Sequence, residues 1–298
     1  MRWAILAGLC VAVGLPVAAW LARPGGGGVA RAVAVTTTTA APQQEPSREP
    51  PAPPQDALVL AGEAGPYAVA LEVQAARLTA VVLSPAGGGA HGLDVRFLPS
   101  GAHGAPCGSG CYTAAARRGR LITVEIGARR ISFALPAHPA PAAALVRRIR
   151  ARYRALPGVA YVERLATGSG AATVTQWRLL PPDRFTYSIA GGPQAVVLGT
   201  RRWDRNSPHG RWTESPQIPR LPQPATLWQS ATNAWLLAPD VVVFADPAIP
   251  AFFRLEFDPA TLRPRFLRMT AASHFMTDRY VNFSPTPALR APRRAAGG

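Results

Sequence analysis

The chain has 298 residues, of which 48% are hydrophobic, and this excludes a wholly disordered protein although 32 residues are proline. It carries 32 basic residues against 16 acidic ones, and every basic residue is arginine. A GC-rich genome explains arginine in place of lysine but not the net charge of +16, which favours an anionic partner such as a lipid headgroup or a wall polymer.

The N-terminus predicts export. Residues 3–22 are uncharged and mostly apolar, between Arg2 and Arg23, and are just long enough to cross a bilayer as a helix. We therefore predict that residues 1–22 are a signal anchor, with a cleaved signal peptide as the alternative. Either leaves the rest of the chain extracytoplasmic, anchored to the cell membrane or secreted if cleaved. This location disfavours nucleic acid as a partner.

Both ends of the chain predict disorder. Residues 23–55 are rich in Gly, Thr and Pro and hold too little apolar surface to fold, so we expect a disordered tether. Residues 289–298 are expected to form a disordered tail.

Residues 56–137 predict a β-sandwich. Tyr67, Val69, Leu71 and Val73 alternate with small or polar residues, and several such short runs follow with turn residues between them. The strand Gly92–Phe97 resembles the G-L-D-V-x-F strand of immunoglobulin-like domains in exported copper-resistance proteins.

Cys107 and Cys111 lie between two of these predicted strands. In an exported protein, a close cysteine pair predicts a disulfide. Gly108 and Gly110 let the intervening chain bend enough for the two sulfurs to meet. A redox or metal site is the alternative, although redox pairs usually precede a helix.

Residues 141–288 predict a second domain that opens with a helix over 140–156. Its apolar stripe is Leu145, Ile149, Tyr153 and Leu156, and arginines cover the remaining surface. That arginine-rich face is either solvated or meets an anionic membrane surface.

Strands follow the helix, and one segment interrupts them. Residues 216–238 combine several prolines with large apolar side chains, including Trp228 and Trp235. We predict a lid over an apolar cavity, with ordinary core packing as the alternative. The chain then alternates again in Phe253, Leu255 and Phe257, turns at Asp258–Thr261, and returns as strands.

Three segments resemble the LolA-like lipoprotein-carrier superfamily. They are residues 173–190 (TVTQWRLLPPDRFTYSIA), residues 195–212 (AVVLGTRRWDRNSPHGRW) and residues 255–269 (LEFDPATLRPRFLRM). The resemblance implies an antiparallel half-barrel that holds lipid or acyl chains. The candidate cavity residues are Trp177, Phe185, Tyr187, Trp203, Trp228, Phe253, Phe257 and Met276.

A copper site is a competing interpretation. Met269, His274 and Met276 supply thioether and imidazole groups, which suit Cu(I). Met269 would point to the opposite face from the other two unless residues 271–273 break the strand. Both methionines could equally fill core space.

The sequence contains no nucleophile elbow, zinc-protease helix or phosphate-binding loop with lysine, so we expect no enzyme and no obligatory cofactor. The sequence thus predicts a mainly β protein, with an immunoglobulin-like sandwich followed by a LolA-like half-barrel that binds a lipid or other apolar ligand. A copper-handling accessory protein and a structural interaction module are the alternative functions.

Overall fold

The computed structural model describes residues 49–115, 119–167, 171–226, 228–284 and 288–292, which belong to one compact unit. The predicted membrane segment, most of the predicted tether and most of the predicted tail lie outside the described residues. Within the described residues, no helix is long and apolar enough to cross a membrane. The fold is mainly β, as the sequence predicts, and every strand pairing is antiparallel.

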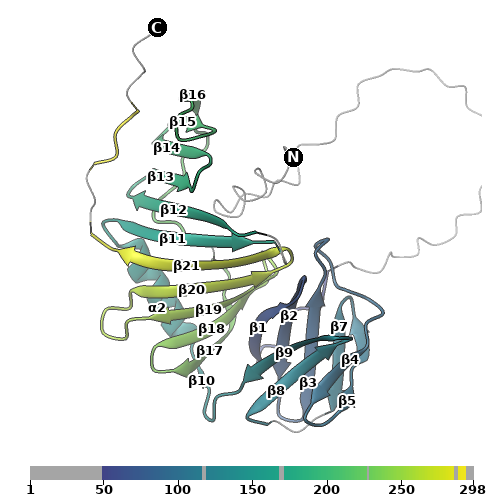
Figure 1. The fold of residues 1–298 in the computed structure, drawn as a ribbon. Helices are drawn as coiled ribbons and strands as arrows, with labels where there is room; N and C mark the ends of the chain where they lie inside the picture. The colour runs from purple at the N-terminus through teal and green to yellow at the C-terminus, as the bar shows by residue number, and fades with distance from the viewer. Residues whose placement is uncertain (1–48, 116–118, 168–170, 227, 285–287, 293–298) are drawn as a thin grey trace, which may run out of the picture. The chain divides into compact units, whose positions relative to one another are not determined.

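The first part of the described chain folds into two sheets (Figure 1). The five-stranded sheet has the order β1 (Leu58–Ala64), β2 (Tyr67–Val73), β3 (Arg77–Leu83), β7 (Cys111–Ala115) and β6 (Ala105–Gly108). The four-stranded sheet has the order β5 (Ala102–His103), β4 (Val95–Leu98), β8 (Leu121–Ile126) and β9 (Arg129–Ala134).

The two sheets enclose one apolar core, so they form the predicted sandwich. Val69, Leu71 and Val73 of β2 face Phe97 of β4 and Val124 of β8, and each is almost fully buried. The alternating residues of β2 that were predicted to share a face therefore do so, because successive side chains of a strand point to opposite faces.

The predicted disulfide is confirmed. Cys107 of β6 and Cys111 of β7 are bonded across a tight hairpin, with their Cα atoms 5.0 Å apart.

Replacing both cysteines with serine is expected to lower the free energy of unfolding by about 2 kcal/mol, since so short a loop restricts the unfolded chain only modestly. Urea denaturation of the oxidised protein and of the serine variant measures this difference. Adding reductant should bring the parent to the midpoint of the variant, and equal midpoints without reductant would contradict the prediction.

The second part of the chain forms one sheet of twelve strands (Figure 1). From one edge to the other, the strands are β10 (Ala140–Pro141), β17 (Thr232–Ala238), β18 (Val241–Asp246), β19 (Ala251–Phe257), β20 (Pro264–Ala271), β21 (His274–Asn282), β11 (Val159–Ala166), β12 (Thr173–Leu180), β13 (Arg184–Ile189), β14 (Gln194–Leu198), β15 (Arg201–Arg205) and β16 (Thr213–Pro216). The last strand in sequence, β21, thus pairs with β11, the first long strand of this sheet.

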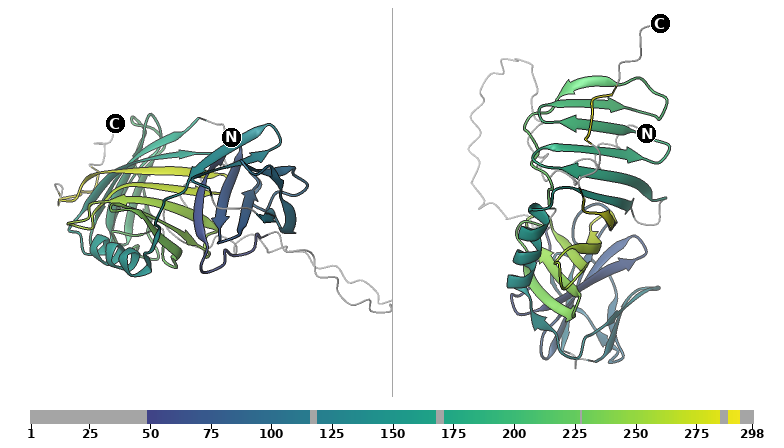
Figure 2. Two further views of the ribbon diagram at one scale, coloured as in Figure 1. Left: turned by 90° about the horizontal axis from the view of Figure 1, so that it is seen from below. Right: turned by 90° about the vertical axis from the view of Figure 1, so that its left-hand side faces the viewer.

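Helix α2 (Ala143–Arg154) packs on one face of this large sheet (Figure 2). Its buried stripe is Val146, Ile149 and Tyr153. The predicted stripe had Leu145 in place of Val146, and Leu145 is half-buried. Ile149 and Val146 lie three residues apart, which brings them to one side of a helix.

A crossing segment, residues 217–231, joins β16 to β17, which lie near opposite edges of the large sheet. Hydrogen bonds along its length hold it in place. The backbone N–H of Gln217 donates to the Thr200 carbonyl at 2.7 Å, and that of Gln223 donates to the Pro182 carbonyl at 2.8 Å. Near its end, the Asp246 carboxylate accepts from two successive backbone N–H groups, and Arg150 donates to the Gln229 carbonyl.

The outer face of the five-stranded sheet packs against the large sheet. Small residues of β1 and β2 allow this close approach, with Ala68 and Ala70 buried against Ala245 and Phe252. Trp235 of β17 donates its indole N–H to the Ala57 carbonyl at 2.9 Å.

Candidate functional site

The register divides the large sheet into two faces, because residues paired across antiparallel strands share a face. The helix face carries Tyr161, Trp177 and Tyr280, which are cross-strand partners, and Tyr153 of α2 packs on Tyr280. The sandwich face carries Ala245 and Phe252, which pack on the sandwich.

A continuous row of aromatic rings crosses the helix face from β18 to β13. Neighbouring ring centroids are 5.1–6.4 Å apart, within the usual range for aromatic pairs. The aromatic row consists of Phe253, Phe244, Trp228, Tyr153, Tyr280, Tyr161, Trp177, Phe185 and Tyr187. Tyr161 and Tyr280 are half-buried and the other members are buried.

Seven of the eight predicted cavity residues lie on the helix face, in two groups. Trp177, Phe185, Tyr187, Trp228 and Phe253 belong to the aromatic row. Phe257 and Met276 are buried at positions that share the helix face with Phe253 and Tyr280.

Trp203 lies on the opposite face, contrary to the prediction. It pairs with Val196, whereas Val197 is the residue that pairs with Phe185. Its indole N–H donates to Glu214 at 3.1 Å, and the Arg201 guanidinium lies over its ring. A tryptophan on a strand near the sheet edge is here covered by local polar contacts rather than by the core.

Residues 216–238, which were predicted to form a lid over an apolar cavity, divide into two parts in the structure. Residues 232–238 are strand β17 of the large sheet. Trp235 packs toward the sandwich. Residues before 232 belong to the crossing segment, whose Trp228 enters the aromatic row beside Phe244 and Phe253.

Two carboxylic acids that the sequence analysis missed lie beside the aromatic row. Glu163 of β11 and Asp278 of β21 are direct cross-strand partners on the helix face, and both are buried. Thr175, also buried, is the partner of Glu163 on the other side. Within the described part of the chain, Asp278 Oδ1 has no hydrogen-bond partner. Their positions in the inward alternation of β11 and β21 are the signal that could have found them.

Burial keeps this acid pair protonated at higher pH than usual. Loss of solvent raises the pKa of Glu163 to about 7. The pKa of Asp278 is raised well above its ordinary value by burial first and by the charge of Glu163 second. The Trp177 indole N–H lies near enough to lower the Glu163 pKa slightly, although its geometry is not that of an ordinary hydrogen bond. At neutral pH a protonated acid of this pair can therefore donate a hydrogen bond to a carbonyl or hydroxyl oxygen.

The three predicted copper ligands share the helix face. Ala272 and Ser273 form the turn between β20 and β21, so Met269 pairs directly with Met276 and does not point away from it. His274 precedes Met276 by two residues and contacts the Ala272 carbonyl through Nδ1 at 3.0 Å. Both methionines are buried, and the described residues contain no cluster of three His, Cys, Asp or Glu side chains suited to a metal.

No protein-family model matches the chain, and no curated protein matches it. Among solved structures, a LolA superfamily protein from Nitrosomonas europaea aligns with 48% of this chain and 94% of its own, with 12% identity and a TM-score of 0.31. The resemblance of the sandwich to immunoglobulin-like domains stays a prediction.

Proposed function

We propose that this protein is a non-catalytic carrier that binds a lipid or other apolar ligand along the aromatic row. The observation that carries the proposal is a row of aromatic rings that is continuous across several strands and whose members Tyr161 and Tyr280 are only half-buried. An acyl chain laid against such a row gains about 0.8 kcal/mol for each buried CH₂ group.

Polar atoms beside the row favour a ligand with an uncharged polar end. Within the described residues, the indole N–H groups of Trp177 and Trp228 and Asp278 Oδ1 have no hydrogen-bond partner. A buried polar atom without a partner costs about 1–3 kcal/mol, and a ligand ester or hydroxyl group would remove that cost. An anionic headgroup would instead be repelled by Glu163 or Asp278 whenever either acid is ionised.

The surroundings of the site are part of the same proposal. The apolar run at residues 3–22 supports export and tethering to the cell membrane, and the sandwich then acts as an immunoglobulin-like spacer. Four arginines of α2, at positions 147, 148, 152 and 154, are exposed. Each would contribute about 1 kcal/mol near an anionic membrane surface, and this attraction would hold the helix beside the source of the ligand.

Fluorescence quenching tests the site directly. We expect a monoacylglycerol with a dibrominated stearoyl chain to quench tryptophan fluorescence of the full-length, delipidated protein. Quenching should largely disappear in a Trp177→Phe/Trp228→Phe variant, because both indoles lie in the aromatic row. A Trp203→Phe variant is the matched control, since Trp203 lies on the other face.

Other outcomes separate the alternatives. Equal loss of quenching in the Trp203→Phe variant, or no quenching at all, would exclude the aromatic row as a lipid site. Native mass spectrometry of the same preparations detects a co-purified lipid. A stoichiometric copper adduct that disappears in a His274→Ala variant would instead favour copper handling, and a bare mass would favour the interaction module.

A further inference from the structure

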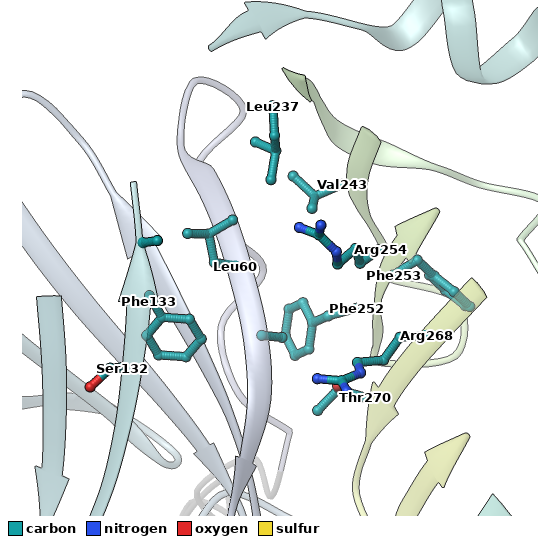
Figure 3. A pocket seen from close by; sticks show the side chains of 12 residues that line it. Leu60, Ser132, Phe133, Leu237, Val243, Phe252, Phe253, Arg254, Arg268 and Thr270 are labelled. Atoms are coloured by element: carbon teal, nitrogen blue, oxygen red, sulfur yellow. The ribbon is translucent and has the colours of Figure 1, made fainter. Parts of the chain in front are cut away.

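A cavity lies on the sandwich face, away from the aromatic row (Figure 3). Its volume is about 170 Å³, slightly more than that of an apolar cavity able to hold benzene. Leu60 and Phe133 of the sandwich form one wall, and Leu237, Val243 and Phe252 of the large sheet form the other. Phe253 points away from it, toward the helix face (Figure 3).

Two arginines line the same cavity. Arg254 and Arg268 are direct partners across β19 and β20, and both point into the cavity (Figure 3). Like charges directly opposite each other destabilise a sheet. An anion bound between the two guanidinium groups would offset this repulsion. Glu256 lies 3.5 Å from Arg254, but within the described residues Arg268 forms no ion pair.

The excess of positive charge continues along the sandwich face. Arg268, the partner of Arg254, also pairs with Thr277, and Thr277 pairs with Arg164. The three arginines 254, 268 and 164 therefore lie in one row across the strands. Arg279 follows Thr277 by two residues on the same face. Arg164, Arg268 and Arg279 are exposed, and no ion pair of theirs occurs within the described part of the chain.

We propose that this cavity binds an anionic amphiphile with one short alkyl chain, such as an alkyl carboxylate or an alkyl phosphate. The head would lie between Arg254 and Arg268, whose guanidinium groups match the geometry of carboxylate and phosphate oxygens. The chain would fill the apolar space between Leu60, Phe133 and Phe252. This ligand is opposite in charge preference to the uncharged ligand proposed for the aromatic row.

Calorimetric titration of the full-length protein with octanoate, below the concentration at which it forms micelles, tests both halves of the ligand. We expect octanoate to bind at least tenfold more tightly than octanol, which lacks the charge, and than acetate, which lacks the chain. Octyl phosphate in place of octanoate shows which head is preferred. Octanol binding as tightly as octanoate would overturn the proposal.

Matched variants locate the binding. Arg268→Gln is expected to weaken octanoate binding at least tenfold, whereas Arg265→Gln removes the same charge from a residue that ion-pairs with Asp258 and should have no effect. Ala134→Phe fills the cavity from an exposed position, so it should weaken octanoate binding without disturbing the core. Unchanged binding in Arg268→Gln would overturn the proposal. Loss of octanoate binding in the Trp177→Phe/Trp228→Phe variant would show that octanoate binds at the aromatic row, and this would also overturn the proposal.

Discussion

Replacing Trp228 with alanine is expected to lower the free energy of unfolding by about 3 kcal/mol. The indole is almost fully buried and its ring contacts those of Tyr153, Phe244 and Phe253 at 6.3, 5.7 and 6.1 Å. Truncation of a buried tryptophan usually costs 3–5 kcal/mol, roughly. The lower end applies here because the unpartnered indole N–H, itself a cost, is removed as well. Urea denaturation measures the change.

Two controls separate the ring from its N–H group. Trp228→Phe keeps an aromatic ring and removes the unpartnered donor, so its stability should remain close to that of the parent. Trp212→Ala removes a half-buried tryptophan that stacks on Arg205 and should cost less than about 1 kcal/mol. Hydrogen exchange at Ser230 should accelerate in Trp228→Ala, and a cost equal to that of Trp212→Ala would contradict the prediction.

Stability is expected to fall as pH rises from about 5 to 8. Burial raises the pKa values of Glu163 and Glu72 from 4.5 to about 7, and burial also raises the pKa of Asp278 well above its ordinary value. The folded protein therefore binds these protons more tightly than the unfolded chain does, so stability is greatest below the unfolded pKa and is lost as the pH approaches the folded one. A shift of this size corresponds to about 3 kcal/mol for one acid.

Neutral variants assign the effect to particular acids. Glu163→Gln should raise stability at pH 8, by up to about 3 kcal/mol, and should flatten the pH profile. It should also lower the pKa of Asp278, which faces Glu163 across the strands and otherwise lies among the phenol groups of Tyr153, Tyr161 and Tyr280. Glu256→Gln, a change at a partly exposed residue, is the control. Urea midpoints between pH 5 and 8 that do not change would contradict the prediction.

The alternation of apolar residues was sufficient to predict the strands and the sandwich core, since the large apolar residues of β2 and of β19 each share one face. It could not assign a strand to a face of the large sheet. Trp203 and Trp177 both lie in alternating strands, yet they point to opposite faces because the register of each hairpin sets the outcome. Met269 shows the same limit, since the turn at Ala272 and Ser273 decides its partner.

The site was predicted only as far as its apolar side chains. Aromatic residues can be recognised in the sequence as candidates for burial. Glu163 and Asp278 cannot be distinguished from solvated acids there, because only strand pairing buries them together. The cavity beside Arg254 and Arg268 requires the contact between sandwich and large sheet, and no local pattern encodes it. The path of the crossing segment could not be predicted either, because only the strand order shows that β16 and β17 lie far apart in the sheet.

The strand order also has a consequence for synthesis on the ribosome. Strand β11 is made early but needs β21, the last strand, as one of its two neighbours. The hairpins from β11 to β16 can form as they emerge, whereas the edge of β11 stays open until residue 282 has been made. Pairings between such distant segments form slowly and leave strand edges exposed meanwhile. Nascent chains that stall before β21 should therefore be the species that chaperones bind and that aggregates.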